Sequence, residues 1–397
     1  TRILAEQSGI SSEMLRMGKI SREDFQKLSF ASQTLAELPL FIDDTPALSI
    51  AALRSRARRL KRRHNISLVV VDYLQLLQGS GKANDNRVNE ISEISRGLKT
   101  LAKELGVIVT AHCENAELVA EMQAKLIAEG NTGTEWHERS RPVRVEAEGV
   151  HHLCTFAELT GAHVYIVHTS NDDAIQAAVA ARRRGVNVWI ETVAPYLVLD
   201  ASYAEKPDFE GAKYVMSPPL RPLPQQDVLW NALASRTVST IATDHAPFDF
   251  KGQKEMGRDD FTKIPNGIPS LEDRVNLVYT YGVKRGRIAL DTFVDACSTQ
   301  AAKLFGLFPR KGTIALGSDA DLVVFDPDYR GKISQKTQQM NVDYSAFEGW
   351  PIEGRPSPAA RASGDRLRGE GTDVTHTVRA PCTSSGNALE RPPAPTS

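Results

Sequence analysis

The chain lacks the marks of several common protein classes. Its 397 residues contain only four cysteines and no C-x-x-C pair, which is too few for a disulfide scaffold. No apolar run approaches the roughly 18 residues of a membrane span, and no basic segment followed by an apolar one opens the chain. We therefore expect no membrane span and a reducing compartment, the cytoplasm.

The chain also lacks an excess of charge of either sign. Its formal net charge is −1 with 24% charged residues, which argues against a surface devoted to nucleic acid or to an anionic membrane. The 41% apolar content is enough for a substantial core and for about two to three domains. The first residue is Thr rather than Met, so we expect a processed, truncated or partial chain.

Strand-like and helix-like segments alternate along most of the sequence. Apolar β-branched runs predict strands over residues 39–44, 67–77, 107–112, 163–168, 186–192, 237–245 and 317–327. Helical periodicity predicts helices over residues 21–38, 49–64, 87–105, 116–130, 144–160, 173–185 and 225–236. Repeated units of strand and helix are typical of an α/β protein with a parallel sheet or barrel.

Three potential metal ligands lie at the ends of predicted strands. His112, His168 and Asp244 occur in TAHCEN, YIVHTS and IATDHAP, where an apolar run gives way to a loop. A single histidine at a strand end is more often structural than a ligand. Three such residues at successive strand ends, however, are how a parallel barrel assembles a hydrolytic metal site, because the carboxyl ends of the strands share one face.

Two motifs are missing, one that would supply further metal ligands and one that would bind a nucleotide. No H-x-H pair occurs upstream of His112. The nearest candidate for a phosphate-binding loop, Gly81 and Lys82, is followed by Ala83, and Leu76 stands where the first glycine is required. The sequence therefore contains no loop that would cradle a nucleotide.

Two further features favour structural interpretations. The basic run over residues 54–63, RSRARRLKRR, spreads around several faces of a helix, so a solvated surface is favoured over a nucleic-acid patch. Asp72 follows an apolar run, VVV, and without a phosphate-binding loop it is interpreted as a carboxylate that ends a strand.

Residues 106–356 resemble the cyclic amidohydrolases, in particular the dihydropyrimidinase and D-hydantoinase group. The matching runs include TAHCENAELVAE, YIVHTSN, ETVAPYLVLD, GAKYVMSPPLRP, IATDHAPFDFKGQKEMGRDDFTKIPNGIPSLEDR, STQAAKLFGLFPRKGTIALGSDADLVVFDPD and MNVDYSAFEGW. The resemblance implies a (β/α)8 barrel with a small β-sandwich and hydrolysis of a ring amide. It also implies two divalent metals, usually zinc, bridged by a carboxylated lysine and a hydroxide.

The same resemblance implies roles for individual residues. His112 and His168 would bind one metal, and Asp244 would bind the other and relay the catalytic proton. The substrate, a small cyclic amide, would be held near Ser217 and Asn266. The H-x-H pair and the lysine of the family are absent, so we expect at most one divalent ion, zinc, and very low or no turnover. The resemblance also implies a homo-oligomer.

Residues 1–105 instead resemble the RecA-like motor domain of the replicative hexameric DNA helicase. The matching runs are ISSEMLRMGKISREDFQKL, LPLFIDDTPALSIAALRSRARRL and LVVVDYLQLLQGSGK. This resemblance implies that Asp72 is the remnant of a Walker B carboxylate. The two resemblances meet within LKTLAKELGVIV, which places the seam at about residues 98–107.

The expected fold is α/β, with the C-terminal half of an amidohydrolase-type barrel preceded by a partial RecA-like segment. Its parts are the helicase-like segment (1–105), the half-barrel (106–310), a β-sandwich remnant (311–356) and a disordered tail rich in Pro, Ala, Arg, Ser and Gly (357–397). The leading hypothesis for function is ring opening of a dihydropyrimidine or hydantoin. The alternatives are a nucleotide-binding or DNA-binding fragment of a helicase, and a non-catalytic chimera.

Overall fold

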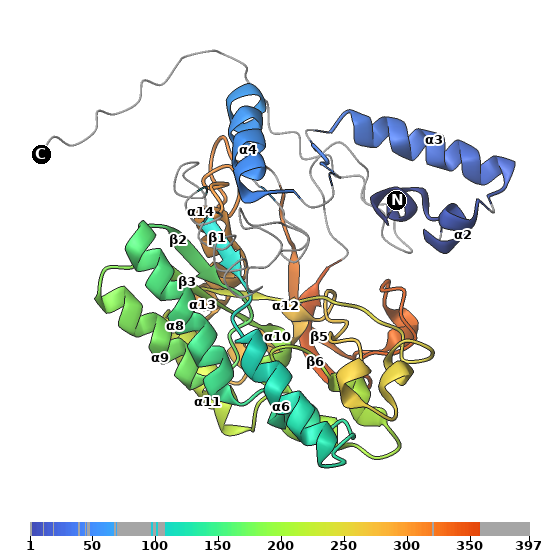
Figure 1. Cartoon of the computed structure of the whole chain (residues 1–397). Helices are drawn as coiled ribbons and strands as arrows, with labels where there is room; N and C mark the ends of the chain where they lie inside the picture. The colour runs from blue at the N-terminus through green and yellow to red at the C-terminus, as the bar shows by residue number, and fades with distance from the viewer. Residues whose placement is uncertain are drawn as a thin grey trace, which may run out of the picture. The chain divides into compact units, whose positions relative to one another are not determined.

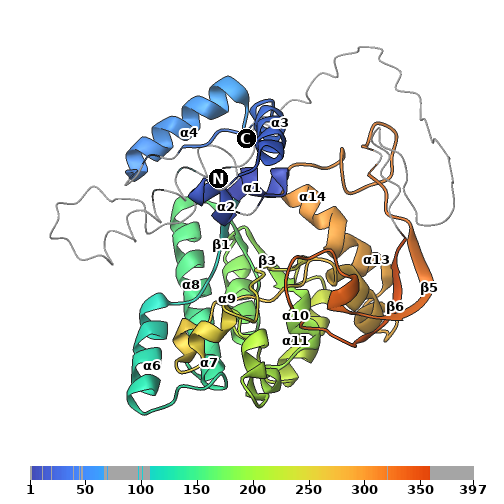
Figure 2. The same cartoon turned by 90° about the vertical axis from the view of Figure 1, so that its right-hand side faces the viewer.

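The computed structural model describes residues 108–319 and 321–357, together with most of residues 2–66 and the single residues 69, 97 and 101. Within residues 2–66 the description omits residues 11, 19, 39, 44, 46 and 47. Figures 1 and 2 show the chain from two directions. None of the helices in these described ranges is long and apolar enough to cross a membrane.

Several expectations lie outside the described residues. They are the strand over 67–77 with Asp72, nearly all of the helix over 87–105, and the tail beyond residue 357. The domain limits and the disorder of the tail therefore stay predictions.

The described residues fall into two compact units. One draws on residues 1–111, 151–165 and 180–188, and the other on residues 112–150, 166–179 and 189–357. All side chains of the candidate site belong to the second unit.

The amino-terminal segment of the first unit is helical, with bounds α1 (Arg2–Ser8), α2 (Ser12–Met17), α3 (Arg22–Ala36) and α4 (Ile50–His64). A capping box starts α3, because Ser21 accepts from the backbone of Asp24 and Asp24 accepts from the backbone of Ser21. Ser49 caps α4 in a similar way, and Asn65 ends it in the left-handed conformation. These caps confirm the helices predicted over 21–38 and 49–64.

The strand predicted over residues 39–44 is wrong for the residues that are described. Leu40, Phe41 and Ile42 belong to no strand and are exposed. Proline at positions 39 and 46 flanks this segment, and proline removes a backbone donor that a sheet ladder requires. The apolar run therefore gave a misleading strand signal.

Four short strands form one sheet in the order β1-β2-β3-β4, with bounds β1 (Ile108–Ala111), β2 (His163–Ile166), β3 (Val188–Val193) and β4 (Thr240–Ala242). β3 and β4 are parallel, with Glu191 opposite Thr240 and Val193 opposite Ala242. Strands that follow one another in both sequence and space, with helices between them, are built from right-handed β-α units. The strands predicted at these four places are confirmed, each within a few residues.

Helices connect these strands. Their bounds are α6 (Ala116–Ala128), α7 (Trp136–Arg139), α8 (Val143–Thr160), α9 (Asp172–Arg183), α10 (Ala194–Val198) and α11 (Pro224–Ala234). α8 and α9 lie side by side in both views (Figures 1 and 2). An ion pair of 3.1 Å joins Arg144 to Asp173 near their starts, and one of 3.0 Å joins Glu158 to Arg184 near their ends. The two helices are therefore parallel, as repeated β-α units require.

The remainder of the second unit consists of short helical turns, two longer helical runs and a strand pair. The turns are η2 (Ala201–Glu205), η3 (Glu210–Tyr214), η4 (Lys254–Gly257), η5 (Phe261–Lys263) and η8 (Gln335–Thr337). The runs are α12 (Arg274–Val278) with η6 (Tyr279–Val283), and α13 (Leu290–Val294) with η7 (Asp295–Thr299) and α14 (Gln300–Leu304).

Two antiparallel strands close this part, β5 (Phe325–Lys332) and β6 (Pro351–Pro356), drawn at the red end of the colour scale in Figures 1 and 2. The strand predicted over residues 317–327 therefore begins too early. Val323 and Val324, its most apolar part, precede β5 and are exposed.

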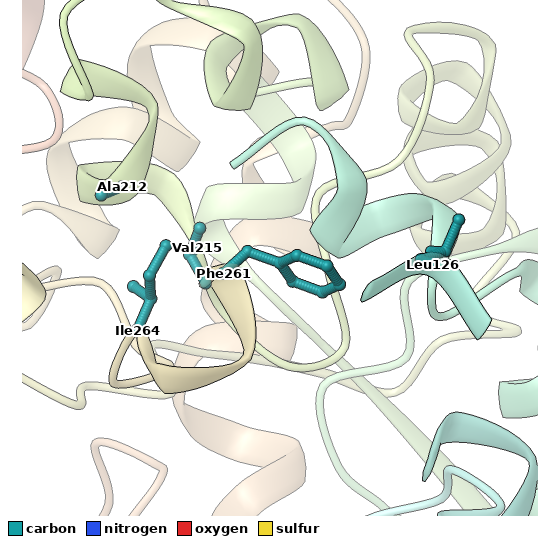
Figure 3. Close-up of a cluster of buried hydrophobic side chains, with 5 residues drawn as sticks. All are labelled: Leu126, Ala212, Val215, Phe261 and Ile264. Atoms are coloured by element: carbon teal, nitrogen blue, oxygen red, sulfur yellow. The ribbon is translucent and has the colours of Figure 1, made fainter. Parts of the chain in front are cut away.

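A small apolar cluster lies beneath the loops that carry the site. Figure 3 shows Leu126 of α6 with Ala212, Val215, Phe261 and Ile264, the Phe261 ring directed toward Leu126. Phe261 is completely buried, and removal of such a ring typically costs about 3–5 kcal/mol. The cluster therefore fixes the segments around Val215 and Ile264, which are used below.

Candidate metal centre

His112 and His168, from the ends of β1 and β2, face each other. Nδ1 of His112 lies 3.0 Å from Nε2 of His168, and the two rings meet edge to face with centroids 4.8 Å apart. Two imidazole nitrogens this close together could both serve as donors to one zinc ion. The two predicted histidines thus come together in a geometry that suits one shared metal ion.

The second ring nitrogen of His112 is held by a buried carboxylate that the sequence analysis missed. Nε2 of His112 lies 3.1 Å from Oε2 of Glu114, and Nη1 of Arg141 donates to the same oxygen at 2.7 Å. The Glu114 side chain is only 2% exposed. Its only signal in the sequence is its position two residues after His112.

The ionisation of Glu114 fixes the tautomer of His112. Burial acts to raise the pKa of Glu114, but the hydrogen bond from His112 and the charge of Arg141 outweigh it, so the pKa is lowered. The ionised carboxylate accepts the N–H at Nε2 of His112, which leaves the lone pair of Nδ1 directed toward His168. A carboxylate behind a histidine is the usual support of a metal-binding imidazole.

His168 is buried and neutral. Its pKa is lowered to about 3, mainly by burial and to a smaller extent by His112. Its backbone has φ of +43°, the left-handed region that residues other than glycine seldom occupy, and its N–H donates to Glu191 at 3.3 Å. A strained backbone at a predicted ligand supports a functional role, because such strain persists only where the surroundings enforce it.

The loop that follows His168 is anchored by a buried ion pair. Nη2 of Arg221 lies 3.0 Å from Oε2 of Glu146, and both side chains are almost inaccessible. Glu146 also accepts from the backbone N–H of Ser170 at 2.9 Å and from the side chain of Asn171 at 2.7 Å. These bonds hold the loop, and with it His168, in one position.

Asp244 follows β4 and also has a left-handed backbone, with φ of +46°. Burial raises the pKa of its carboxyl group, and the charge of His112 acts in the opposite direction. No hydrogen bond or ion pair to this carboxylate occurs within residues 108–319 and 321–357 or the described amino-terminal residues. The carboxyl group is thus available for a metal ion or a proton.

Two of the three predicted ligands come together in the described part of the chain. Within the described part of the chain, no group of three or more His, Cys, Asp or Glu side chains is already arranged to hold a metal. The structure brings His112 and His168 together but does not bring Asp244 into such a group with them. A resident pair of metal ions, as the resemblance implies, does not fit these residues.

The two predicted substrate residues lie on neighbouring segments. Ser217 precedes Pro218 through a cis peptide bond, and its Oγ is buried without a hydrogen-bond partner among the described residues. Asn266 is exposed. The backbone N–H of Gly267 donates to the carbonyl of Val215 at 2.9 Å, so the two segments are joined beside these residues.

Gly267 is required at this junction. Its φ of +152° is one that side chains disfavour, and an added Cβ would collide with the side chain and the carbonyl oxygen of Ala246. The segment that carries Asn266 therefore packs closely on the loop that follows Asp244.

A parallel sheet with imidazole and carboxylate groups at the carboxyl ends of its strands is the arrangement of metal-dependent hydrolases built on α/β barrels. The model of the amidohydrolase family matches residues 80–351, and the chain belongs to this family. The alternation of strands and helices agrees with the α/β fold of its solved relatives.

The chain is similar to several D-hydantoinases. It is 52% identical over 255 residues to that of Geobacillus stearothermophilus and 44% identical over 271 residues to that of Ralstonia pickettii. These matches cover 64% and 68% of this chain, but only 54% and 59% of the relatives. A solved D-hydantoinase (dihydropyrimidinase) from Thermus sp. superposes with a TM-score of 0.65 and 62% identity, covering 67% of this chain and 58% of that one.

A second family model, the DnaB-like helicase C-terminal domain, matches residues 1–124. The two family matches overlap over residues 80–124, a range that contains the expected seam at 98–107. Similarity to a replicative helicase is thus found in the amino-terminal segment, as the sequence predicts.

Proposed function

We propose that this chain binds one divalent metal ion, zinc, through His112 and His168, and that the site opens the ring of a cyclic amide. The observation that carries this proposal is the 3.0 Å approach of the two imidazole nitrogens, one of which is backed by an ionised carboxylate. The expected substrate is a dihydropyrimidine or a 5-substituted hydantoin, and the product is an N-carbamoyl amino acid. The names of the similar proteins support this choice.

The chemistry divides between the metal and the side chains. A divalent ion at the two histidines would supply Lewis-acid polarisation of the ring carbonyl. A water molecule attacks the polarised ring carbonyl carbon, and the bond from that carbon to the ring nitrogen breaks. Asp244 takes a proton from the water and delivers it to the leaving ring nitrogen, a role that suits a carboxyl group whose pKa is raised by burial. Ser217 and Asn266 hold the ring amide, and the unpartnered Oγ of Ser217 supports this assignment.

Turnover is expected to be far below that of the longer relatives. The sequence has no H-x-H pair, and the segment where the family lysine belongs resembles a helicase instead. With one ion in place of two, the site lacks the second positive centre that orients the attacking and leaving groups. We also propose that the parts of the chain end at residues 105, 310 and 356, and that the protein forms a homo-oligomer.

The test uses purified full chain loaded with zinc or manganese and offered hydantoin and dihydrouracil. We expect about one ion per chain by elemental analysis, and slow ring opening that is abolished by chelator and by Asp244→Ala but not by Asp259→Ala, a change at an exposed aspartate. Two ions per chain would overturn the single-ion site. Failure of metal to bind, or turnover that survives Asp244→Ala, would refute the proposed chemistry.

A second candidate function concerns the amino-terminal segment, and the helicase family match favours it. The last turn of α4 carries Lys61, Arg62, Arg63 and His64, a local positive charge that would attract a phosphate backbone. This candidate predicts salt-sensitive, nucleotide-stimulated binding of single-stranded DNA. A binding isotherm that stays flat at low salt would eliminate it.

A further inference from the structure

Three buried side chains hold the segment Val215–Pro218 by its carbonyl groups. Lys254 donates to the carbonyl of Val215 at 2.9 Å, Nε2 of His137 lies 2.8 Å from that of Met216, and the hydroxyl of Tyr196 donates to that of Pro218 at 2.6 Å. All three donors are buried. Only Ser217 in this segment makes no hydrogen bond within the described part of the chain.

Lys254 also reaches the second substrate segment. Its Nζ donates to the carbonyl of Pro265 at 2.7 Å and to that of Gly267 at 2.8 Å, on either side of Asn266. With the bond to Val215, all three donors of an ammonium group are used. One side chain therefore joins the segment of Ser217 to the segment of Asn266.

The burial of Lys254 costs folding free energy. Lys254 is fully buried, and no carboxylate within the described ranges forms an ion pair with it. Burial lowers the pKa of its ammonium group to about 7. A buried cation with no counter-charge is an expensive way to pack a core, so the gain must lie in what the three hydrogen bonds position.

We propose that Lys254 is a positioning residue that sets the spacing between Ser217 and Asn266, and thereby the fit of the ring amide between them. This inference rests on the proposed function, because the two residues matter only if a ring amide binds there. Lys254 itself touches neither the substrate nor the metal. His137 and Tyr196 support only the Ser217 side, whereas Lys254 joins both.

The test compares the full chain with Lys254→Met, Lys254→Gln and the control Lys263→Met, which changes a lysine that is 68% exposed. Hydrogen exchange followed by mass spectrometry reports each segment separately. For Lys254→Met we expect faster exchange in peptides covering residues 214–218 and 264–268 together, with residues 112–114 and 168–171 unchanged. Lys254→Gln, which keeps two donors, should give an intermediate effect and covers the case in which the methionine variant does not fold.

Ligand binding provides the second arm, measured on zinc-loaded protein by calorimetry. We expect Lys254→Met to weaken the binding of hydantoin by about tenfold or more, which corresponds to the net free energy of one to two hydrogen bonds. The binding of acetohydroxamate, which contacts the metal alone, should stay unchanged. Equal weakening of both ligands, or exchange that rises across the whole unit, would show a general structural role and overturn the proposal. If the parent chain binds no hydantoin, the proposed function fails. Hydrogen exchange tests the positioning role separately: rates in residues 214–218 and 264–268 that do not change in Lys254→Met would refute it.

Discussion

At the scale of single residues, the carboxylate of Glu114 fixes the orientation of His112, one of the two histidines proposed to bind a metal. It holds Nε2 of His112 while Arg141 holds the carboxylate in turn. The orientation and the tautomer of the imidazole both depend on this chain of contacts. If the proposed site holds a metal, its affinity depends partly on residues that do not touch the ion.

We predict that Glu114→Gln lowers zinc affinity by about 10–100-fold, because the amide accepts the imidazole proton more weakly and no longer raises the basicity of the ring. Competition with a chromophoric chelator measures this change. Glu117→Gln, at an exposed position in the first turn of α6, is the matched control and should leave the affinity unaltered. Equal affinity of the parent and Glu114→Gln would contradict the support role of Glu114.

The residues of the site could be predicted from sequence only in part. His112, His168 and Asp244 could be named as candidates because each lies at the end of a strand signal, and their roles stay predictions. Glu114, Lys254 and His137 could not be named, because a charged or polar residue is ordinarily exposed, and their burial results from segments distant in the sequence. Lys254 in particular meets its partners 11 to 39 residues away.

At the scale of elements, a buried carboxyl group that directly precedes α12 holds its proton to a higher pH than usual. Asp273 precedes this helix, is buried, and accepts from Nε2 of Gln338 at 2.8 and 2.9 Å. The pKa of Asp273 is raised from 3.8 to about 7, mainly by burial. The hydrogen bond from Gln338 opposes this rise, and the charge of Glu272 adds to it. The folded chain therefore keeps a proton that the unfolded chain releases.

We predict a pH dependence of stability from this group. Its pKa is higher in the folded chain, so its stabilising contribution is complete below about pH 4 and is lost as the pH rises through about 7. Relative to Asp273→Asn, the parent should therefore lose unfolding free energy between pH 5 and pH 7.5, as measured by urea titration at each pH. Asp259→Asn serves as the exposed control, and parallel curves for the parent and Asp273→Asn would refute the assignment.

Secondary structure was predictable where local signals agreed with each other. The helices at α3 and α4 had polar residues at their starts, and these residues form the expected caps. The sheet strands combined apolar runs with the spacing of β-α repeats. Residues 39–44 and the start of 317–327 had only an apolar run, and a run by itself does not provide the neighbouring strand that a sheet requires.

At the scale of the whole molecule, one segment of the described chain exposes several large apolar side chains. Ile314 is 87% exposed, Leu316 is fully exposed at 107%, and Val323 is 67% exposed, all within the segment 305–324. Contiguous exposed apolar residues promote association. The chain also spans little more than half of the D-hydantoinase of Geobacillus stearothermophilus.

We predict that replacing Ile314 and Leu316 with lysine reduces self-association and the binding of an apolar fluorescent dye, without lowering the unfolding midpoint. Light scattering after size exclusion and dye fluorescence measure the two effects. Leu223→Lys, which changes an exposed leucine outside the segment, is the control. A drop in the unfolding midpoint for the double variant would show that these side chains are packed in solution.

The left-handed backbone at His168 and Asp244 has a consequence for the history of such a chain. Glycine would relieve the conformational strain at both positions, by about 1 kcal/mol or more each, while erasing the donor side chains. A protein under no selection for catalysis would therefore become more stable to heat if glycine replaced these two residues. Their presence here means that the chain keeps two strained positions whose donor side chains the proposed site would use.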